Sequence, residues 1–457
     1  MTSFNTLNIS KEALDNLSSL QYEKMTEIQE KSLPLIIEGH DVIAQAKTGS
    51  GKTVSFSLPI ILKLDVKHFR VQSLILAPTR ELAAQVANEL RKLARFRHNV
   101  KILELCGGVA YRPQVHSLFH GAHILVGTPG RILKHLSEDN IKCDDINTLV
   151  LDEADKMLDM GFLEDINEII SYLPKERQTL LFSATFDEDI KSIASSILNK
   201  PKTVQVALKH NENVINEQYY KVDNENKTPL ISTIISSFKP ESILIFCNTK
   251  IKCDELADDL YALGFDVVTL HSDLDQKDRD EVLLMFSNKS YPILIATDVA
   301  SRGLDIDDIS LVINYDIAND EKVHTHRIGR TARAGKKGMA ISLCNYYDEE
   351  KMLDFNQILE KETVFSDSTL LEDDISFKLD CPFRTIYING GKKHKVRAGD
   401  LLGALTGSIG LGKDDIGKIN IFNFCSYVAI KRDVFDKALT GLNDQRIKGK
   451  YYKAYGR

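Results

Sequence analysis

The feature that most constrains the fold is the eight-residue segment 46–53, which lies between a short apolar run and an apolar helical pattern. It reads Ala-Lys-Thr-Gly-Ser-Gly-Lys-Thr and fits the phosphate-loop pattern, with Ala46 in place of the first glycine. Residues 41–45 predict a strand that leads in, and the stretch from Thr53 predicts a helix that leads out. A strand, a glycine-rich turn and a helix in this order hold phosphates on backbone N–H groups and on the helix N-terminus. The segment therefore predicts a nucleotide site in an α/β domain.

An acidic segment further along the chain is the second strong signal. Residues 148–151 are a short apolar run typical of a buried strand, and Asp152, Glu153 and Asp155 follow it. Carboxylates at the exit of a buried strand are what a Mg²⁺–nucleotide site needs. Acidic residues also favour the first turn of a solvated helix, so this segment alone leaves both interpretations open. Together with the phosphate loop, it indicates a site for a nucleotide and Mg²⁺.

The residue types at the two segments suit phosphoryl transfer, which needs positioning and charge neutralisation more than covalent help. Lys52 is expected to neutralise phosphate oxygens, and Thr53 and Asp152 are expected to hold Mg²⁺. Glu153 is close enough in sequence to share that site, where its carboxylate can orient and deprotonate the attacking water.

The net charge of −7 conceals an asymmetry along the chain. Residues 382–457 carry 15 Lys and Arg against 6 Asp and Glu, a net charge of +9. The rest of the chain carries 43 basic and 59 acidic residues, a net charge of −16. A basic segment on an acidic body favours a nucleic-acid partner over a surface that is merely rich in lysine.

Composition excludes several other classes of protein. The chain contains no run of about 18 apolar residues, so no membrane span is predicted. The N-terminal residues lack the basic and apolar stretches of a secretory signal. The 7 cysteines are scattered without a Cys-x-x-Cys pair, which favours free thiols over a zinc site or a disulfide framework. These features predict a cytoplasmic protein of about three domains.

Strand and helix patterns divide the chain into four parts. Residues 1–207 alternate short strands with helices and residues 208–356 repeat the pattern, which predicts two tandem doubly wound parallel-sheet α/β domains. Residues 357–381 are charged and poorly periodic and are interpreted as a connector. Residues 382–457 follow the β-α-β-β-α-β order of a ferredoxin-like α+β domain. Only the first α/β domain has a phosphate loop, so we expect the nucleotide to bind there and the second domain to complete the site.

The predicted strands of the α/β domains follow directly from the apolar runs, and a polar linker is expected at 209–213. These strands are 42–45, 73–76, 102–105, 123–126, 148–151 and 179–182 in the first domain, then 242–246, 267–270, 293–296, 311–314 and 340–343 in the second.

The motifs of these domains, taken in order, resemble those of the DEAD-box ATP-dependent RNA helicases over residues 1 to about 356. Besides the phosphate loop, the matching segments are 22–29, 78–82, 107–108, 128–131, 152–155, 183–185, 245–249, 276–279, 296–305 and 326–331. The resemblance implies that both domains are RecA-like and that the protein couples hydrolysis of ATP, with Mg²⁺, to the remodelling of RNA.

The resemblance also implies roles for individual residues. ATP contacts are expected from Tyr22, Gln29, Ala46, Lys47, Thr48, Gly49, Ser50, Gly51, Lys52, Thr53, Gly303 and Asp305. Among them, the amide of Gln29 can donate and accept at once, as reading an adenine edge requires. The catalytic set is Lys52, Asp152, Glu153, Arg327 and Arg330, and the residues expected to couple the sites are Ser183, Thr185 and His326.

The two arginines lie three residues apart on a predicted helix and so point the same way. Their fixed charge suits the γ-phosphate in the transition state, and their place on the second domain would make hydrolysis depend on closure. A helix that carries surface salt bridges is the alternative interpretation.

The resemblance also implies a set of RNA contacts in the core, at helix starts and loops, which grip phosphates and do not read bases. They are Pro78, Thr79, Arg80, Gly108, Thr128, Pro129, Gly130, Arg131, Asn248, Thr249, Arg279 and Thr297. A core of this kind bends one strand and separates base pairs locally. Specificity must then come from elsewhere in the chain.

Residues 382–457 resemble the C-terminal RNA-binding domain of the DbpA/YxiN subfamily, in segments 386–400, 402–407 and 416–419. The resemblance implies an RRM-like domain that targets a hairpin of 23S ribosomal RNA in the pre-ribosomal large subunit. The expected phosphate-binding surface is Lys392, Lys393, Lys395, Arg397, Lys448, Lys450 and Lys453.

Several alternatives stay open from the sequence. The C-terminal domain could be a nonspecific RNA tether, and the whole protein a general RNA chaperone or an ATP-gated RNA clamp. A DNA translocase is the other rival, although DNA is not the expected partner. A monomer is expected.

Overall fold

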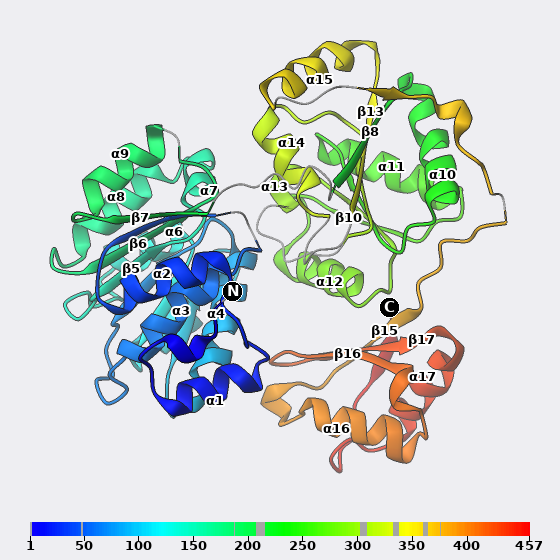
Figure 1. Ribbon diagram of the computed structural model, residues 1–457. Helices are drawn as coiled ribbons and strands as arrows, with labels where there is room; N and C mark the ends of the chain where they lie inside the picture. The colour runs from blue at the N-terminus through cyan, green and yellow to red at the C-terminus, as the bar shows by residue number, and fades with distance from the viewer. Residues whose placement is uncertain are drawn as a thin grey trace. The chain divides into compact units, whose positions relative to one another are not determined.

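The protein is described from a computed structural model, for residues 2–46, 49–186, 188–206, 215–301, 309–331, 338–359, 364–374 and 376–457. Within these residues the strands form three sheets, two of seven strands and one of four. The chain divides into two compact units, of which the first contains one seven-stranded sheet and the second contains the other two sheets (Figure 1).

The first unit is a parallel sheet with the strand order β3-β4-β2-β5-β6-β1-β7. Its strands are β1 (Val42–Gln45), β2 (Ser73–Leu76), β3 (Ile102–Leu105), β4 (Ile124–Gly127), β5 (Thr148–Leu151), β6 (Gln178–Ser183) and β7 (Lys202–Gln205). Its helices are α1 (Lys11–Ser19), α2 (Glu27–Ile37), α3 (Lys52–Lys63), α4 (Arg80–Leu93), α5 (Tyr111–Phe119), α6 (Pro129–Ser137), α7 (Ala154–Asp159), α8 (Leu163–Tyr172) and α9 (Glu188–Ile197).

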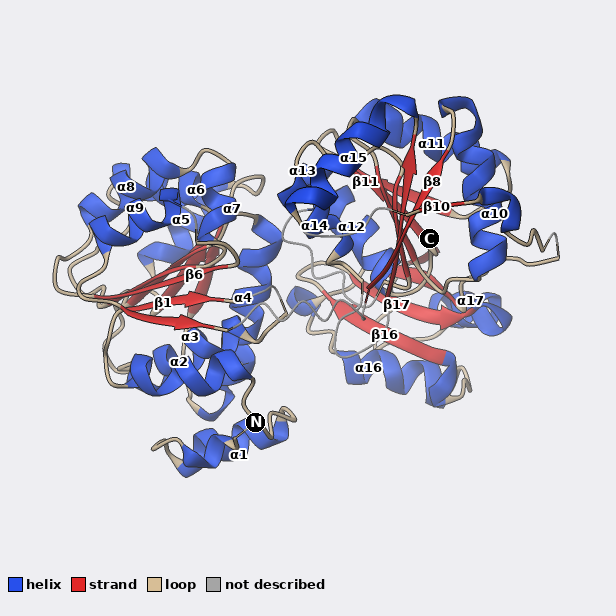
Figure 2. Cartoon of the chain, turned by 45° about the horizontal axis from the view of Figure 1, so that its top comes forward, coloured by secondary structure: helices blue, strands red, loops and turns tan. Residues whose placement is uncertain are grey.

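Helices cover both faces of this sheet, as Figure 2 shows. All four residues of β5 are buried: Val150 belongs to the apolar cluster under α2, α3 and α4, while Leu149 and Leu151 belong to the cluster under α6, α8 and α9. A strand buried on both faces reads as a continuous apolar run, which is why the sequence predicted this strand well.

The second unit begins with another parallel sheet, in the order β10-β11-β9-β12-β13-β8-β14. Its strands are β8 (Ile215–Lys221), β9 (Ile243–Phe246), β10 (Val267–Leu270), β11 (Ile293–Ala296), β12 (Leu311–Asn314), β13 (Gly338–Cys344) and β14 (Phe365–Ser366). Its helices are α10 (Lys227–Phe238), α11 (Lys250–Ala262), α12 (Gln276–Ser287), α13 (Asp298–Ser301), α14 (Glu321–Ile328) and α15 (Tyr346–Ile358).

The C-terminal domain is an antiparallel sheet with the order β16-β17-β15-β18. Its elements are β15 (Phe383–Ile388), α16 (Ala398–Gly403), a π-helical turn (Ala404–Ser408), β16 (Ile416–Ile421), β17 (Ser426–Lys431), α17 (Phe435–Asp444) and β18 (Ala454–Gly456). The predicted fold class, two parallel α/β domains followed by a small ferredoxin-like domain, is confirmed.

Three strands were missed in the sequence, and each lies at or near a sheet edge. They are β7, β8 and β14. In β8 only Tyr219 and Tyr220 are buried, so its sequence lacks the apolar run that marked the inner strands. β14 and the 3₁₀ turn Ser368–Leu370 lie in the predicted connector, and Phe377 and Leu379 pack against the core of the second α/β domain. The connector is therefore partly an extension of that domain. The predicted linker at 209–213 lies outside the described residues.

Within the second unit, the sheet of the C-terminal domain contacts α12 and the segment after it. Thr385 is fully buried, on the face of β15 opposite to the core residue Ile386. Its hydroxyl lies 2.7 Å from the Ser290 hydroxyl. Arg457 forms an ion pair with Glu281 of α12, with 2.6 Å between Nε and Oε1. The sheet face that RRM-like domains use to stack bases is therefore engaged here by α12.

In the described part of the chain, every helix is too short or too polar to cross a lipid bilayer.

Candidate nucleotide and RNA sites

The phosphate loop joins β1 to α3, as its pattern predicted. Gly49 and Gly51 have φ of 80° and 93°, and α3 begins at Lys52. A Cβ at Gly51 would lie 2.5 Å from Gln29 Nε2, so this position requires glycine both for its backbone conformation and for space. Lys47 and Thr48 lie outside the described residues.

Buried polar atoms without partners lie at this loop and beside it. Lys52 Nζ and Asp152 Oδ1 have no hydrogen bond among the described residues, although the two residues are only 6% and 2% exposed. Burial raises the pKa of Asp152 to about 7, against the opposing effect of the Lys52 charge. Buried polar atoms without partners are rare and point to a ligand. A phosphate on Lys52 and a hard cation on Asp152, with Thr53 at the first turn of α3, fit this donor set.

Glu153 lies next to Asp152 and is held in place by its neighbours. It precedes α7 with φ of 52°, an uncommon conformation for a residue other than glycine. Its carboxylate pairs with Lys156, with 2.7 Å between Oε2 and Nζ, and both side chains are buried. The ion pair thus holds the predicted base in position. The left-handed backbone conformation of Glu153 is unfavourable by itself and must be maintained by tertiary contacts.

The predicted adenine-reading residue is also fixed. Gln29 Nε2 donates to the carbonyl of Gly51 at 3.1 Å, and Gln29 Oε1 accepts from the N–H of Thr26 at 2.9 Å, in a capping box. Tyr22 donates to Glu89 on α4 at 2.6 Å. The amide therefore joins the segment before α2 to the phosphate loop, while its role in reading adenine stays a prediction.

One residue that the sequence reasoning left without a role links two motifs. Asp155 Oδ2 accepts from the N–H groups of Ala184 and Thr185, both at 3.0 Å. The predicted coupling residues Ser183 and Thr185 therefore lie at the end of β6, beside the acidic segment. The signal available in the sequence was a third carboxylate after the strand. His326, the third coupling residue, lies on α14 of the second α/β domain.

The RNA-contact residues predicted in the first domain gather at one edge of its sheet. Thr79 caps α4 and Thr128 precedes α6, and these helices follow the neighbouring strands β2 and β4. A Cβ at Gly108 would collide with the Arg80 guanidinium. The helix starts thereby bring together Pro78, Thr79, Arg80, Gly108, Thr128, Pro129, Gly130 and Arg131.

In the second domain the predicted RNA contacts also follow neighbouring strands. Thr249 caps α11 after β9, and Thr297 follows β11, which pairs with β9. Arg279 on α12 donates to the carbonyl of Ala300 at 3.3 Å. Asn248 uses its side chain internally, because its Nδ2 donates to the carbonyl of Ile317 at 3.0 Å. Gly303 and Asp305 lie outside the described residues.

Arg327 is occupied in a way that the motif pattern did not indicate. It is 1% exposed, and its guanidinium pairs with Asp298 through Nε at 2.6 Å and Nη2 at 2.7 Å. The remaining three bonds reach Asn314 Oδ1, the Asp316 carbonyl and Asn248 Oδ1. All five N–H donors of the guanidinium are thus used within this domain. These contacts give Arg327 a structural role within this domain, while the predicted roles of Arg327 and Arg330 toward the γ-phosphate stay predictions.

We expect Arg327→Met to destabilise the second α/β domain by about 3–5 kcal/mol, because it removes a buried ion pair with Asp298 and the other hydrogen bonds of the guanidinium. The change would be measured as the urea unfolding free energy of the transition that includes this domain. Lys250→Met, which breaks an exposed pair with Asp273, is the control and should cost at most about 1 kcal/mol. Equal stability of the two variants would contradict the structural role.

The basic residues of the C-terminal domain lie together although they are far apart in the sequence. The N–H of Asn389 donates to the carbonyl of Lys453 at 2.9 Å, and Lys448 Nζ donates to the carbonyl of Lys395 at 3.1 Å. The loop after β15 and the segment before β18 are therefore neighbours. They expose all seven predicted phosphate-binding residues, Lys392, Lys393, Lys395, Arg397, Lys448, Lys450 and Lys453.

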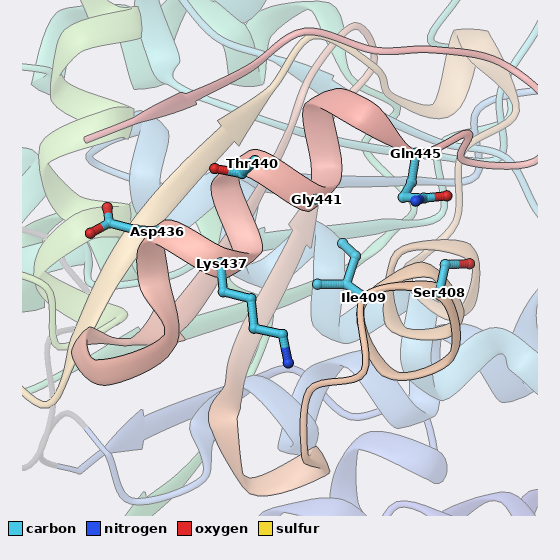
Figure 3. A pocket seen from close by; sticks show the side chains of 7 residues that line it. All are labelled: Ser408, Ile409, Asp436, Lys437, Thr440, Gly441 and Gln445. Carbon is cyan, nitrogen blue, oxygen red and sulfur yellow. The ribbon is translucent and has the colours of Figure 1, made fainter.

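A groove on the helical side of this domain is separate from that basic surface. It has a volume of about 500 Å³ between α17 and the π-helical turn (Figure 3). Its lining consists of Ser408, Ile409, Asp436, Lys437, Thr440, Gly441 and Gln445. These lining residues include none of the predicted RNA contacts.

Comparison with known protein families gives three matches, one in each of the three domains that contain a sheet. A family model described as DEAD/DEAH box helicase matches residues 26–193. The helicase conserved C-terminal domain matches residues 225–335, and the DbpA RNA binding domain matches residues 385–455.

Two curated relatives span almost the whole chain. The ATP-dependent RNA helicase DbpA of Escherichia coli (strain K12) is 46% identical over 455 residues, which cover 98% of each chain. The protein of the same name from Bacillus subtilis (strain 168) is 36% identical, with 99% of each chain covered. Among solved structures, S. cerevisiae Dbp5 bound to RNA and ADP BeF3 is 30% identical with a TM-score of 0.72, covering 80% of this chain and 96% of that one. The chain therefore belongs to the DbpA subfamily of the DEAD-box ATP-dependent RNA helicases.

Proposed function

We propose that this helicase locally unwinds or remodels 23S ribosomal RNA during assembly of the large ribosomal subunit, targeted by its C-terminal domain to a hairpin of that RNA. The observation that carries the proposal is the exposed basic surface on adjoining loops of a domain that matches the DbpA RNA-binding model. Such a surface follows the backbone of a folded RNA. The protein would act as a monomer in the cytoplasm, on the pre-ribosomal particle and not on DNA.

We assign the hydrolytic step to the first α/β domain. Lys52 would hold the transferred phosphoryl group, and Glu153 would accept the proton of the attacking water. A Mg²⁺ ion held by Thr53 and Asp152 would neutralise the charge that develops on the phosphate oxygens. The unpartnered Lys52 Nζ and Asp152 Oδ1 support this assignment. Arg330 of the second domain would complete the site only on closure, which would couple turnover to RNA.

The test compares steady-state ATP turnover with the ribosomal hairpin and with a scrambled hairpin of equal length. The proposal expects stronger stimulation by the native hairpin. Equal stimulation by both would indicate a general RNA chaperone, and binding without RNA-stimulated turnover would indicate an RNA clamp. Equal stimulation by single-stranded DNA would indicate a DNA translocase. Each of these three results would overturn the proposal.

A chain truncated after Cys381 should keep a weak, sequence-blind response to RNA and should no longer prefer the native hairpin. The reason is the division of charge, with +9 on residues 382–457 and −16 on the rest. The comparison uses RNA-dependent turnover of the truncated and complete chains. If the truncated protein still prefers the native hairpin, the recognition site lies in the helicase core.

Because truncation also uncovers the α12 contact, a full-length variant gives a cleaner version of the same prediction. Replacing Lys392, Lys393 and Lys395 with alanine should weaken hairpin binding and flatten its salt dependence by about one unit for each phosphate that is no longer bound. The control replaces Lys413, Lys431 and Lys437 with alanine, which removes the same amount of positive charge. Lys431 lies at the other end of the sheet, because Ile388 pairs with Ser426 and Phe383 pairs with Lys431. Lys413 lies toward the same end, in the turn before Ile416, which pairs with Ile430. Equal effects of both triple variants would indicate a nonspecific tether.

A further inference from the structure

We propose that Gln114 is a positioning residue that sets the orientation in which Arg131 contacts an RNA phosphate. Gln114 belongs to none of the sequence motifs and lies on α5, where it is 8% exposed. The inference rests on the proposed RNA contact of Arg131 and deepens it by naming the group that governs its geometry.

The amide of Gln114 is bonded on both sides. Its Oε1 accepts from Arg131 Nη1 at 2.9 Å and from His135 Nε2 at 3.0 Å, both on α6. Its Nε2 donates to the carbonyl of Cys106 at 3.1 Å, at the end of β3. The reversed amide would face two donors with its NH₂ group and a carbonyl with its oxygen, so only one orientation satisfies all three contacts. Gln114 thus fixes α6 and the segment before Gly108 to α5.

His135 completes this arrangement as a donor, because Arg131 and the carbonyl of Cys106 already fix the Gln114 oxygen toward it. The ring is fully buried, and burial, with the Arg131 charge adding to it, lowers the pKa of His135 to about 4. At neutral pH the ring is uncharged and must carry its proton on Nε2 to donate to Gln114. Oε1 of Gln114 then accepts two hydrogen bonds, which uses both of its lone pairs and leaves the Arg131 bond a single geometry.

Tyr111 provides a wall beside the guanidinium. Its ring stacks on His135 with 4.4 Å between centroids and an interplanar angle of 16°. The Arg131 Cζ lies 5.3 Å from the centre of the same ring. The Tyr111 hydroxyl is tied to Glu138 at 2.8 Å, so the ring itself is held. Arg131 is therefore restrained by a flat aromatic face as well as by the amide.

The restraint leaves part of the guanidinium available. Within the described residues, the remaining bonds of Arg131 are long ones, at 3.4 Å, from Nη1 and Nη2 to the carbonyl of Val109. Three of the five N–H donors are then used, and two remain for an anion. Val109 follows Gly108, which is one of the expected RNA contacts. The amide of Gln114 bonds to Arg131 and to Cys106. It therefore connects the segment around Gly108 with the start of α6, and both are expected to contact RNA. A preorganised arginine binds a phosphate more tightly than a free one, because less side-chain entropy is lost.

The experiment is a double-mutant cycle on the full chain with Gln114→Met and Arg131→Met. The affinity for a single-stranded RNA is measured with a nonhydrolysable ATP analogue, together with its salt dependence. Gln114→Met should weaken RNA binding by about tenfold, on the scale of one charge-assisted contact. The double variant should bind RNA no more weakly than Arg131→Met alone, because Gln114 acts through that residue. The salt slope should flatten by up to about one unit in each single variant.

Two further variants separate positioning from a structural role. Ser117→Ala removes a side-chain hydrogen bond on the same helix, from Ser117 to the carbonyl of Pro113, and it should bind RNA as the natural chain does. Gln114→Glu keeps the acceptor for Arg131 and should bind RNA more tightly than Gln114→Met. Nucleotide affinity without RNA should be unchanged in all variants, which shows that the first domain is folded.

Additive effects in the cycle, an unchanged salt slope in Gln114→Met, or equal affinities of Gln114→Met and Gln114→Glu would each overturn the inference. Normal RNA binding by Arg131→Met would overturn it together with the proposed contact of Arg131. Absence of RNA-stimulated turnover in the natural chain would instead overturn the proposed function, and the two failures are therefore distinguishable.

Discussion

Glu153→Gln should bind ATP and retain RNA while ATP turnover falls by about 100-fold or more. The amide keeps the shape of the side chain and can still accept a hydrogen bond from Lys156, which lies 2.7 Å from the carboxylate. It has no basicity, so the attacking water would keep its proton. The RNA complex should persist for as long as ATP is present, since release depends on hydrolysis.

The measurements for this variant are phosphate release, nucleotide binding and RNA binding with ATP. The change also removes the buried ion pair between Glu153 and Lys156, so a thermal melt must accompany them. Glu164→Gln, at an exposed acid in the first turn of α8, is a control with the same change of charge. Near-normal turnover in a folded Glu153→Gln chain would falsify the assignment of Glu153 as the base.

Arg330→Ala should lose the RNA-stimulated part of ATP turnover, by about 100-fold or more, while nucleotide affinity without RNA changes by no more than a few-fold. Arg330 lies just after α14, in the second α/β domain, whereas the phosphate loop lies in the first. An arginine that reaches the γ-phosphate only on closure contributes to the transition state and not to the initial binding of nucleotide.

Nucleotide affinity is measured first without RNA, and turnover is then measured with saturating RNA. Lys351→Ala, at a cation on α15 of the same domain, controls for a loss of positive charge. Arg330→Lys should recover little, because an ammonium lacks the planar fork of a guanidinium. Weakened nucleotide binding without RNA, or unchanged turnover with it, would contradict the assignment.

Arg327 and Arg330 show where reasoning from motifs reaches its limit. The sequence predicted both arginines on one helix, but α14 ends at Ile328 and Arg330 lies beyond it. Both carry the charge that a phosphate needs. Only the structure shows that Arg327 uses all of its donors on Asp298, Asn314, Asp316 and Asn248. Partners that lie 11 to 79 residues away cannot be identified from spacing along a helix.

The sequence by itself determined the two parallel α/β domains and the strand ends at which the phosphate loop and the acidic segment lie. Strands buried on both faces are continuous apolar runs, and the loops after them meet at one edge of a parallel sheet. The phosphate loop and the acidic segment could therefore be placed together from local pattern alone. The edge and near-edge strands β7, β8 and β14 escaped because a half-buried strand has a weaker apolar pattern.

The tertiary structure alone decided which polar groups are used and which are left available. It showed that Gln114 holds Arg131, that Asp155 holds Thr185, and that Thr385 is buried beside Ser290. The spacing of apolar residues that marks a buried strand or helix involves residues close together in the chain, so it can be recognised from the sequence. The partners of a buried polar group come from distant segments, so the free energy that orients such a group depends on a fold that must already be formed.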